Sequence, residues 1–500
     1  MPNLILPASF RALLGEFRQT FTAPSFQNFV LLVCGFVHAL GQHRLTNALR
    51  AVGSLAPKHF TTYYRFVSRA RWSLDEFGLT LLAVVLAGFG SHVVVRLVLD
   101  DTLTHRTGKK VALATSHADP VLKQSNGRPF ISYGHVFVVL SVHVSAPWVA
   151  STGWALPFLF RLFEGSKQGG KLDSPSDQRR EQNRRLAGKT PRRRVRLRDQ
   201  KVVDGKLVPC KPEPDTGPLP DKGRPTKLQL ATELILLVAR RFPNVRFRVL
   251  ADHLYTGEAV LDGVHSQVSN VHFIMRGRPD AALFTLPPPR KQGQRGRPRV
   301  KGEQLPCPEA WAKSHPEAFR RETISMYGKS VEVELASYLG MPYRSLPGRL
   351  VRYVIVRDPR GIYRPAYLFC TDPDVPDTEV VEEYARRWPL EVAFEASKQK
   401  LGIEHPRTQL PTAVRRSAPF GMLLYSLTII WYLRDGCRLA GFATLPPDAW
   451  YLKTARPSFA DMLACLRRAS WSQWFSDPSC NTADRQQILA EYLDRVVASG

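Results

Sequence analysis

The stretch "HVVVRLVLDD", residues 92–101, has the composition of a β-strand and ends in two acidic side chains. Between His92 and the closing Asp100 and Asp101, every residue is valine or leucine apart from Arg96. Such a run predicts a strand. Catalytic groups are often held at strand ends by a rigid scaffold. An Asp there also commonly begins a turn or caps the next helix, so the ordinary interpretation stays open for each Asp taken alone.

The order of apolar patterns around this strand predicts the fold class. Two further strand candidates follow, "FISYGHVFVVLSVHV" (130–144) and "WALPFLFRLF" (154–163). Then "PTKLQLATELILLVARRF" (225–242) predicts a helix, while "NVRFRVLAD" (244–252) and "VHFIMR" (271–276) predict strands. Three successive strands followed by strand–helix alternation predict an α/β protein with a mixed sheet and helices on its faces.

The charge of the chain indicates the class of partner. Its 500 residues include 70 Lys and Arg against 43 Asp and Glu, a formal net charge of +27. Such a surface attracts polyanions, with nucleic acid as the first candidate and an acidic membrane surface as the rival. We find no apolar run of the roughly 20 residues that a spanning helix needs, and no secretory signal pattern. The seven cysteines form no C-x-x-C pair, which argues against a zinc site and fits a reducing cytoplasm.

A long polar insert, residues 164–225, separates the first three strands from the next helix. Within it, "QRREQNRRLAGKTPRRRVRLR" (178–198) holds ten basic residues and one acid. We expect this segment to be disordered in the free protein and to contact DNA phosphates when bound. The candidate contacts include Arg192, Arg193 and Arg194.

A second basic segment is the Pro/Gly-rich linker at 286–306, which contains "QRGRPRVKG". Arg295 and Arg297 in this linker are candidates for insertion into a narrow A·T minor groove. The alternative, which we favour from composition, is a basic linker that touches phosphates without sequence preference. The segments 1–90, 178–198 and 286–306 are all open candidates for recognising specific DNA.

The segment "YARRWPLEVAFEASKQKLG" (384–402) combines an acid with aromatic and basic residues at helical spacing. In one helix, steps of three, four and seven residues place four side chains within roughly 60° of one another. These side chains are Tyr384, Arg387, Glu391 and Lys398. An exposed face with ordinary i,i+4 charge pairs is the plain alternative. Pro389 predicts a kink or a helix start, so the shared face is firmer for Glu391 and Lys398 than for the other two.

Three acidic positions therefore stand out: Asp100 or Asp101, Asp252 at the end of its strand, and Glu391 on the late helix. Oxygen ligands suit Mg²⁺ or Mn²⁺, and two such ions can hold the attacking and leaving oxygens of a phosphoryl displacement. Clustered carboxylates repel one another, so such a site is destabilising without a cation. A very basic protein with three gathered acids is expected to cut DNA or RNA.

These features resemble the ribonuclease-H-like core of DDE transposases. The helix segment, Trp388 and Pro389 included, is similar to the Tyr-Arg-Glu-Lys signature of one group of bacterial insertion-sequence transposases. "LVLDDTLT" resembles the group's first Asp motif, and "VLADHLYTGEAVL" resembles the second, with His253 where an Arg is common. The β-rich stretch before Glu391 resembles the group's insertion domain.

The resemblance implies a catalytic, metal-binding triad of Asp100, Asp252 and Glu391, with Asp101 as the alternate for the first Asp. It implies two Mg²⁺ or Mn²⁺ ions, and DNA contacts from Tyr384, Arg387 and Lys398 near the cleaved end. The expected reaction is hydrolysis at transposon ends followed by transfer of the freed 3′-hydroxyl into target DNA. The expected partners are the terminal inverted repeats, target DNA and a second copy of the chain, in the nucleoid of a bacterial cytoplasm and not at a membrane.

The division into domains that we expect follows from the same comparison. It comprises a helical DNA-binding region (1–90), the first part of the catalytic core (91–277), a β-rich insertion with its basic linker (278–380), the end of the core (381–435) and a helical C-terminal region (436–500). Two other functions stay open. One is a related metal-dependent nuclease or integrase, and the other is a non-catalytic DNA-binding protein derived from a transposase.

Overall fold

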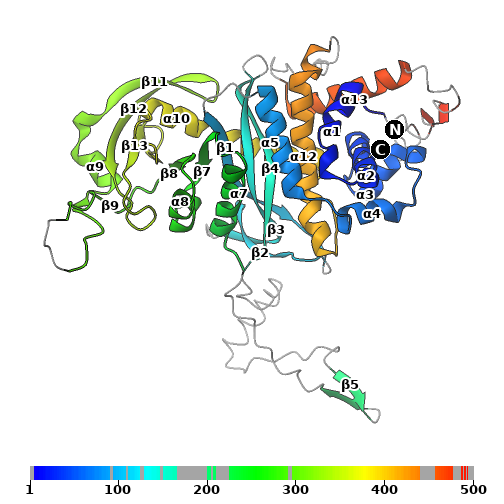
Figure 1. The fold of residues 1–500 in the computed structure, drawn as a ribbon, viewed down its shortest axis with the longest axis horizontal. Coiled ribbons are helices and arrows are strands. Elements are labelled where there is room, and N and C mark those ends of the chain that lie inside the picture. Colours follow the sequence, from blue (N-terminus) through cyan, green and yellow to red (C-terminus); the bar gives the residue numbers. More distant parts are fainter. Residues whose placement is uncertain are drawn as a thin grey trace.

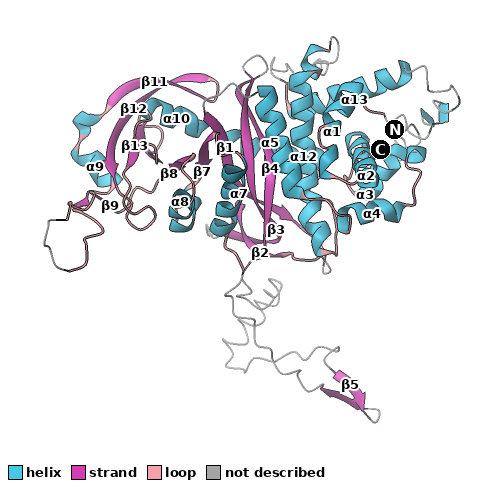
Figure 2. Cartoon of the chain, viewed as in Figure 1, coloured by secondary structure: helices cyan, strands magenta, loops and turns pink. Residues whose placement is uncertain are grey.

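Strand β1 (Val94–His105) lies inside a ten-stranded mixed sheet that runs through the molecule (Figures 1 and 2). The computed structural model describes residues 5–89, 94–108, 111–123, 129–146, 150–165, 200–203, 206–209, 224–290, 296–439 and 457–476, with isolated residues between 483 and 493. The strands of the sheet are β1, β2 (Thr115–Lys123), β3 (Pro129–Ala146), β4 (Ala150–Phe163), β7 (Arg246–Ala251), β8 (Val271–Arg276), β11 (Arg320–Met326), β12 (Lys329–Gly340), β13 (Val351–Arg357) and β14 (Ala366–Cys370). Two small sheets pair β5 (Gln200–Val203) with β6 (Lys206–Pro209), and β9 (Leu283–Phe284) with β10 (Gln304–Leu305).

The pairing directions give the core its topology. β3 is antiparallel to both β1 and β4, whereas β1 is parallel to β7, and β7 is parallel to β8. The resulting order β4-β3-β1-β7-β8 is that of the ribonuclease-H-like sheet that the sequence predicted. Beyond β8 the sheet continues through β14, β13 and β12 to β11, all antiparallel.

Helices cover the sheet and form one end of the molecule, where the N-terminal region meets the C-terminal helix α13 (Figure 1). The helices before β1 are α1 (Ala8–Gly15), α2 (Ala23–His38), α3 (Leu45–Val52), α4 (Phe60–Ser68) and α5 (Leu74–Phe89). The later ones are α7 (Lys227–Arg241), α8 (Glu258–His265), α9 (Pro308–Ser314), α10 (Asp377–Ala385), α11 (Trp388–Leu401), α12 (Pro411–Arg434) and α13 (Phe459–Ser476). The predicted fold class is therefore confirmed, including its helical ends and the β-rich stretch before Glu391.

Local sequence explains the helices that pack directly on the sheet. Helix α7 begins with a capping box, in which Thr226 and Gln229 satisfy each other's backbone N–H groups. Helix α12 is apolar almost all round, and a helix of that kind must be buried. Its Tyr425 and Trp431 are fully buried, and α12 and α5 both pack on β4. Among the described residues, no helix is long and apolar enough to cross a membrane.

Two predictions about these elements were wrong in detail. The strand predicted to end at Asp101 continues to His105, because β3 pairs with it along that whole length. The segment 384–402, considered above as one helix, belongs to two helices, α10 and α11, that meet at Arg386 and Arg387. Pro389 lies in the first turn of α11, where its missing N–H has no partner to lose, so the predicted helix start is confirmed.

Several predicted DNA contacts fall outside the described residues. These are Arg192, Arg193 and Arg194 of the basic insert, and Arg295 of the basic linker. Arg297 is described, and its side chain is exposed. It follows Gly296, whose φ of +96° lies in the region that favours glycine.

Candidate active site

Asp100 and Asp101 lie in the middle of β1 and point to opposite faces of the sheet, as consecutive strand residues do. Asp100 Oδ2 accepts a hydrogen bond of 2.5 Å from Arg387 Nη1. Asp101 instead accepts bonds from Lys227 Nζ at 2.7 Å and from the Tyr255 hydroxyl at 3.1 Å. Only Asp100 therefore lies on the face that carries Arg387 and α11.

Asp252 is brought beside Asp100 by the register of two parallel strands. Leu99 on β1 pairs with Ala251 on β7. The residues that follow this pair are Asp100 and Asp252. Neighbouring strands lie about 4.8 Å apart. Asp252 is the residue before the short 3₁₀ helix His253–Tyr255, and its Oδ1 lies 3.0 Å from His253 Nδ1. The predicted second acid thus lies at the strand end, on the same stretch of sheet as the first.

Glu391 reaches this place from the first turn of α11. Its Oε1 accepts a bond of 2.5 Å from Arg387 Nη2, so one guanidinium bridges Asp100 and Glu391. Asp252 and Tyr384 also interact electrostatically with Arg387. All three predicted acids therefore surround a single arginine, which supplies a positive charge among them.

The electrostatic environment differs among the acids. Burial raises the pKa of Asp100 to about 6, and the nearby carboxylates of Asp101 and Glu391 act in the same direction against Arg387. Burial also acts to raise the pKa of Asp252, but hydrogen bonds from His253 and the charge of Arg387 hold it below its usual value. The pKa of Arg387 is raised, because the attraction of the acids outweighs its own burial.

The sequence of this chain matches a known protein family. The sequence profile described as "DDE superfamily endonuclease" matches residues 16–330, which is more than half of the chain. The chain belongs to this superfamily. The match includes Asp100 and Asp252 and ends before Glu391.

No curated protein matches this DDE superfamily chain. The solved structures to which it is similar include the "piggyBac transposase synaptic complex with hairpin DNA", at 10% sequence identity. That similarity covers 98% of this chain and 83% of the other, with a TM-score of 0.38.

The acids of this DDE superfamily protein are held by the packing of α10 as well as α11. Glu383 on α10 is buried and accepts bonds from Arg96 Nε on β1 at 2.6 Å and from Arg386 Nη1 at 2.8 Å. Arg248 on β7 lies 3.8 Å from the same carboxylate. Arg96 shares its face of β1 with Asp100, so this buried ion cluster fixes α10 over the side of the sheet where the acids lie.

Lys398 lies apart from the three acids of this DDE superfamily site. It is seven residues beyond Glu391 on α11, about 10 Å along the axis. It is half-buried, and burial lowers its pKa, while Glu404 and Asp119 act in the opposite direction. Because α10 ends before Arg387, the four-residue stripe predicted on one helix does not exist as such. Glu391 and Lys398 share α11, whereas Tyr384 belongs to α10.

Sequence reasoning missed several side chains around the acids of this DDE superfamily chain. Lys227 and Tyr255 fix Asp101 from positions 126 and 154 residues away along the chain. Glu383, which lies one residue before Tyr384, is the buried partner of three arginines. A glutamate between charged and aromatic neighbours gives no local signal of burial, so no pattern in the sequence identified it.

Proposed function

We propose that this chain is a DNA transposase of the bacterial insertion-sequence group with the Tyr-Arg-Glu-Lys signature. It would hydrolyse a phosphodiester at each transposon end and transfer the freed 3′-hydroxyl into target DNA. The observation that carries the proposal is the gathering of Asp100, Asp252 and Glu391 around Arg387 on one side of the sheet. Membership in the DDE superfamily endonucleases supports the same reaction class.

Endonucleases of this superfamily generally use divalent metal ions, which need oxygen ligands from the protein. The three candidate ligands are all carboxylates, the donors that Mg²⁺ and Mn²⁺ favour. Among the described residues, no three His, Cys, Asp or Glu side chains converge closely enough to hold an ion as they stand. Arg387 occupies bonding positions on Asp100 and Glu391, so ion binding requires it to release them.

Once Arg387 has released the two carboxylates, the three acids fit a divalent-ion site. Asp100, Asp252 and Glu391 would then hold two Mg²⁺ or Mn²⁺ ions. Bound there, the ions would supply charge stabilisation for the attacking and leaving oxygens. The chain's own part is to fix two carboxylates by strand register and the third by a helix start. Asp101 is already bonded to Lys227 and Tyr255, which favours Asp100 as the first acid.

The proposed partner is DNA. Its ends would lie across the face that bears Arg387 and Tyr384, with Lys398 further along α11 as a cation for phosphates. Additional phosphate contacts would come from exposed Arg297 and from the basic insert. We further propose that residues 1–90 recognise DNA, that 278–380 form an insertion, and that two copies of the chain assemble on paired ends.

Substitution of Glu391 tests the catalytic proposal. Wild-type protein and the Glu391→Gln variant are incubated with DNA that carries the element's ends and with Mg²⁺, and nicked products are counted. Cleavage is expected to be lost in Glu391→Gln while binding to the same DNA persists. The matched control is Glu395→Gln, one turn further along α11, where Glu395 is exposed and bonded only to Gln399 within the described part of the chain. Cleavage by Glu391→Gln at the wild-type rate would refute the assignment.

The same assay separates a transposase from the two other functions. A pre-cut end supplied with target plasmid is expected to give joined product. Cutting without joining would identify a related metal-dependent nuclease. Binding without cutting by the wild-type chain would identify a non-catalytic DNA-binding protein.

A further inference from the structure

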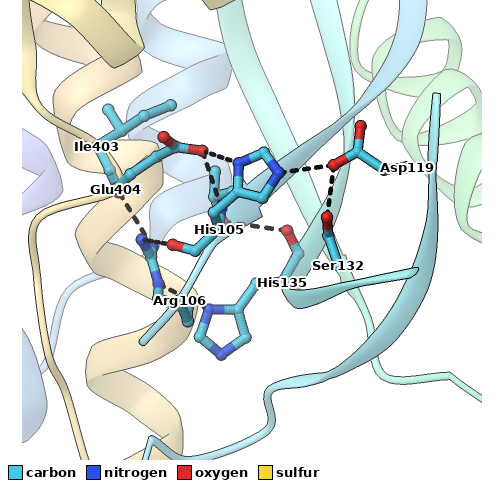
Figure 3. Close-up of polar contacts among 8 residues, drawn as sticks. His105, Arg106, Asp119, Ser132, His135, Ile403 and Glu404 are labelled. Atoms are coloured by element: carbon cyan, nitrogen blue, oxygen red, sulfur yellow. Dashed lines mark hydrogen bonds and ion pairs between the residues drawn. The ribbon is translucent and has the colours of Figure 1, made fainter. Parts of the chain in front are cut away.

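His105, the last residue of β1, lies between two carboxylates that come from different parts of the chain (Figure 3). Its Nε2 is 2.7 Å from Asp119 Oδ2 on β2, and its Nδ1 is 2.9 Å from Glu404 Oε1, just beyond α11. Asp119 is buried and its Oδ2 also accepts a bond of 2.7 Å from the Ser132 hydroxyl on β3. A neutral imidazole has one N–H, so both bonds to carboxylates require the doubly protonated, cationic ring.

These contacts join the end of β1 to the end of α11. Glu404 Oε1 accepts a second bond, of 2.8 Å, from the backbone N–H of His105. The neighbouring Arg106 donates to the carbonyl of Ile403 at 3.0 Å (Figure 3). Helix α11 ends at Leu401, and Gly402 follows in the left-handed conformation. Residues 403 and 404, which contact the end of β1, therefore come directly after the end of the helix.

The two elements that are joined in this way carry two of the proposed catalytic acids. Asp100 lies on β1, five residues before His105, or about 17 Å along the strand. Glu391 lies on α11, as does Lys398, which is close enough to Glu404 and Asp119 to interact with both. The His105 contacts are thus remote from the acids, yet they join the ends of the two elements that carry Asp100 and Glu391.

We propose that protonated His105 is a positioning residue that fixes α11 against β1 and so holds Glu391 and Lys398 in their places relative to Asp100. This inference rests on the proposed function for its effect on cleavage. His105 does not touch the reacting atoms. It acts through Glu404 and Asp119, and loss of its second proton removes one of the two bonds that its ring makes to these carboxylates. The backbone bond from His105 to Glu404 and the bond from Arg106 to Ile403 do not depend on that proton.

Among the described histidines near this cluster, His105 is the one whose pKa is raised, whereas burial lowers the pKa of His405, which follows Glu404, and of His117 on β2. Burial lowers the pKa of His105, but the bonds to Asp119 and Glu404 outweigh it, and the pKa is raised above 6.5. From α11, Lys398 faces the same carboxylates. From β3, His135 accepts a bond from Arg106 Nε at 3.1 Å, and burial lowers its pKa to about 4, so it is neutral at pH 7.

The direction of the pH effect follows from the raised pKa of His105. Because the folded-state pKa of His105 is raised, its contribution is complete at low pH and is lost as the pH rises through the folded-state value. Cleavage itself can depend on pH for other reasons. The informative quantity is therefore the ratio of wild-type to His105→Asn cleavage rates at each pH, because the variant lacks the titrating group.

The experiment measures this ratio between pH 6 and 9 on full-length protein with Mg²⁺ and end-bearing DNA. A ratio of about tenfold or more is expected at pH 6, falling toward one at pH 9. Glu404→Gln keeps an acceptor but removes a charge, so the pH at which the wild-type advantage fades should move down by about one unit. His315→Asn, at a distant site, should keep the wild-type profile. A ratio that stays constant with pH would overturn the proposal.

A second measurement does not depend on activity. Hydrogen exchange of the amides in residues 388–404, measured without DNA, should show strong protection at pH 6 that weakens by pH 9 after correction for intrinsic exchange. His105→Asn should lack the protection at both values. Equal protection in the two proteins would refute the role of His105. Loss of protection as expected, in a wild-type chain that never cleaves DNA, would refute the proposed function alone.

Discussion

Arg387 provides the sharpest test of how the acidic site is stabilised. Its side chain is 17% exposed, and that of Asp100 is 20% exposed, so this ion pair is largely removed from water. Removing one partner of a buried ion pair costs about 3–5 kcal/mol, because the other charge is left uncompensated. The pair with Glu391, which is 37% exposed, adds at most about 1 kcal/mol after solvent screening. Arg387→Met should therefore lower the free energy of unfolding by about 3–5 kcal/mol in the absence of divalent ions.

Divalent ions should restore part of this loss, because they can take the place of the missing positive charge. An ion at 100 times its dissociation constant stabilises the folded state by about 2.7 kcal/mol. In the wild-type protein the ion has to displace Arg387 first, so the stabilisation should be smaller. Unfolding in urea, followed by circular dichroism at pH 7.5 with Mg²⁺ or with a chelator, measures both effects.

The control for this test is Arg278→Met, which removes an exposed ion pair. Arg278 and Asp280 are 65% and 62% exposed, and an exposed pair of this kind contributes little to stability because solvent screens it. Its loss should be small and independent of Mg²⁺. Equal stability of Arg387→Met and the wild-type protein in chelator, or equal stabilisation of the two by Mg²⁺, would refute the stabilising role of Arg387.

Three further outcomes follow from single contacts. Asp100→Asn should reduce the cleavage rate by at least about a thousandfold, and Asp101→Asn should reduce it much less. Equal losses in the cleavage assay would contradict the assignment of Asp100 and Asp101 to opposite faces of β1. Burial lowers the pKa of His38 to about 4, so as the pH falls from 6.5 to 4 the unfolded chain takes up a proton that the folded chain resists. The proton uptake by the unfolded chain should lower the free energy of unfolding by about 3 kcal/mol between pH 6.5 and pH 4. In His38→Asn the free energy of unfolding should depend less on pH over this range, and an unchanged slope would contradict the role of His38. Gly402→Ala should destabilise by about 1–3 kcal/mol in thermal unfolding, because φ is +53° and the new Cβ would lie 2.1 Å from His405 Nδ1; an unchanged midpoint would contradict the cap geometry.

The central strands of the sheet could be predicted from sequence because their signal is local. "VHFIMR" (271–276) coincides with β8, and the strand of 244–252 contains β7. The outer strands β2 and β11 escaped prediction. β11, "RRETISM", has only Ile324 buried, and both strands lie at the edges of the sheet. Natural edge strands are commonly polar, and their pairing through backbone groups leaves no apolar pattern to find.

The sequence was enough to propose three candidate acids, but the side of the sheet that Asp100 and Asp101 each face could not be predicted from it. Alternation along a strand showed that only one of Asp100 and Asp101 faces the site. The aspartate that faces the candidate site is identified by the helices on the two sides of the sheet. Helix α11 packs on the side of Asp100, and α7, with Lys227, packs on the side of Asp101. The direct bonds from Arg387 to the acids also depend on the break between α10 and α11, which Pro389 signalled without showing how the two helices would turn.

The bridging role of Arg387 changes how the acidic cluster is understood. Three carboxylates gathered without a cation would repel one another. Two of the five N–H donors of the guanidinium satisfy Asp100 and Glu391, so the site can fold before any ion arrives. In the proposed transposase the same guanidinium is a phosphate ligand. A phosphate that draws Arg387 away leaves the carboxylates uncompensated and raises their affinity for divalent ions. By linkage, ions that displace Arg387 raise its affinity for phosphate by the same factor. The chain would then hold its catalytic ions most tightly when DNA is in place.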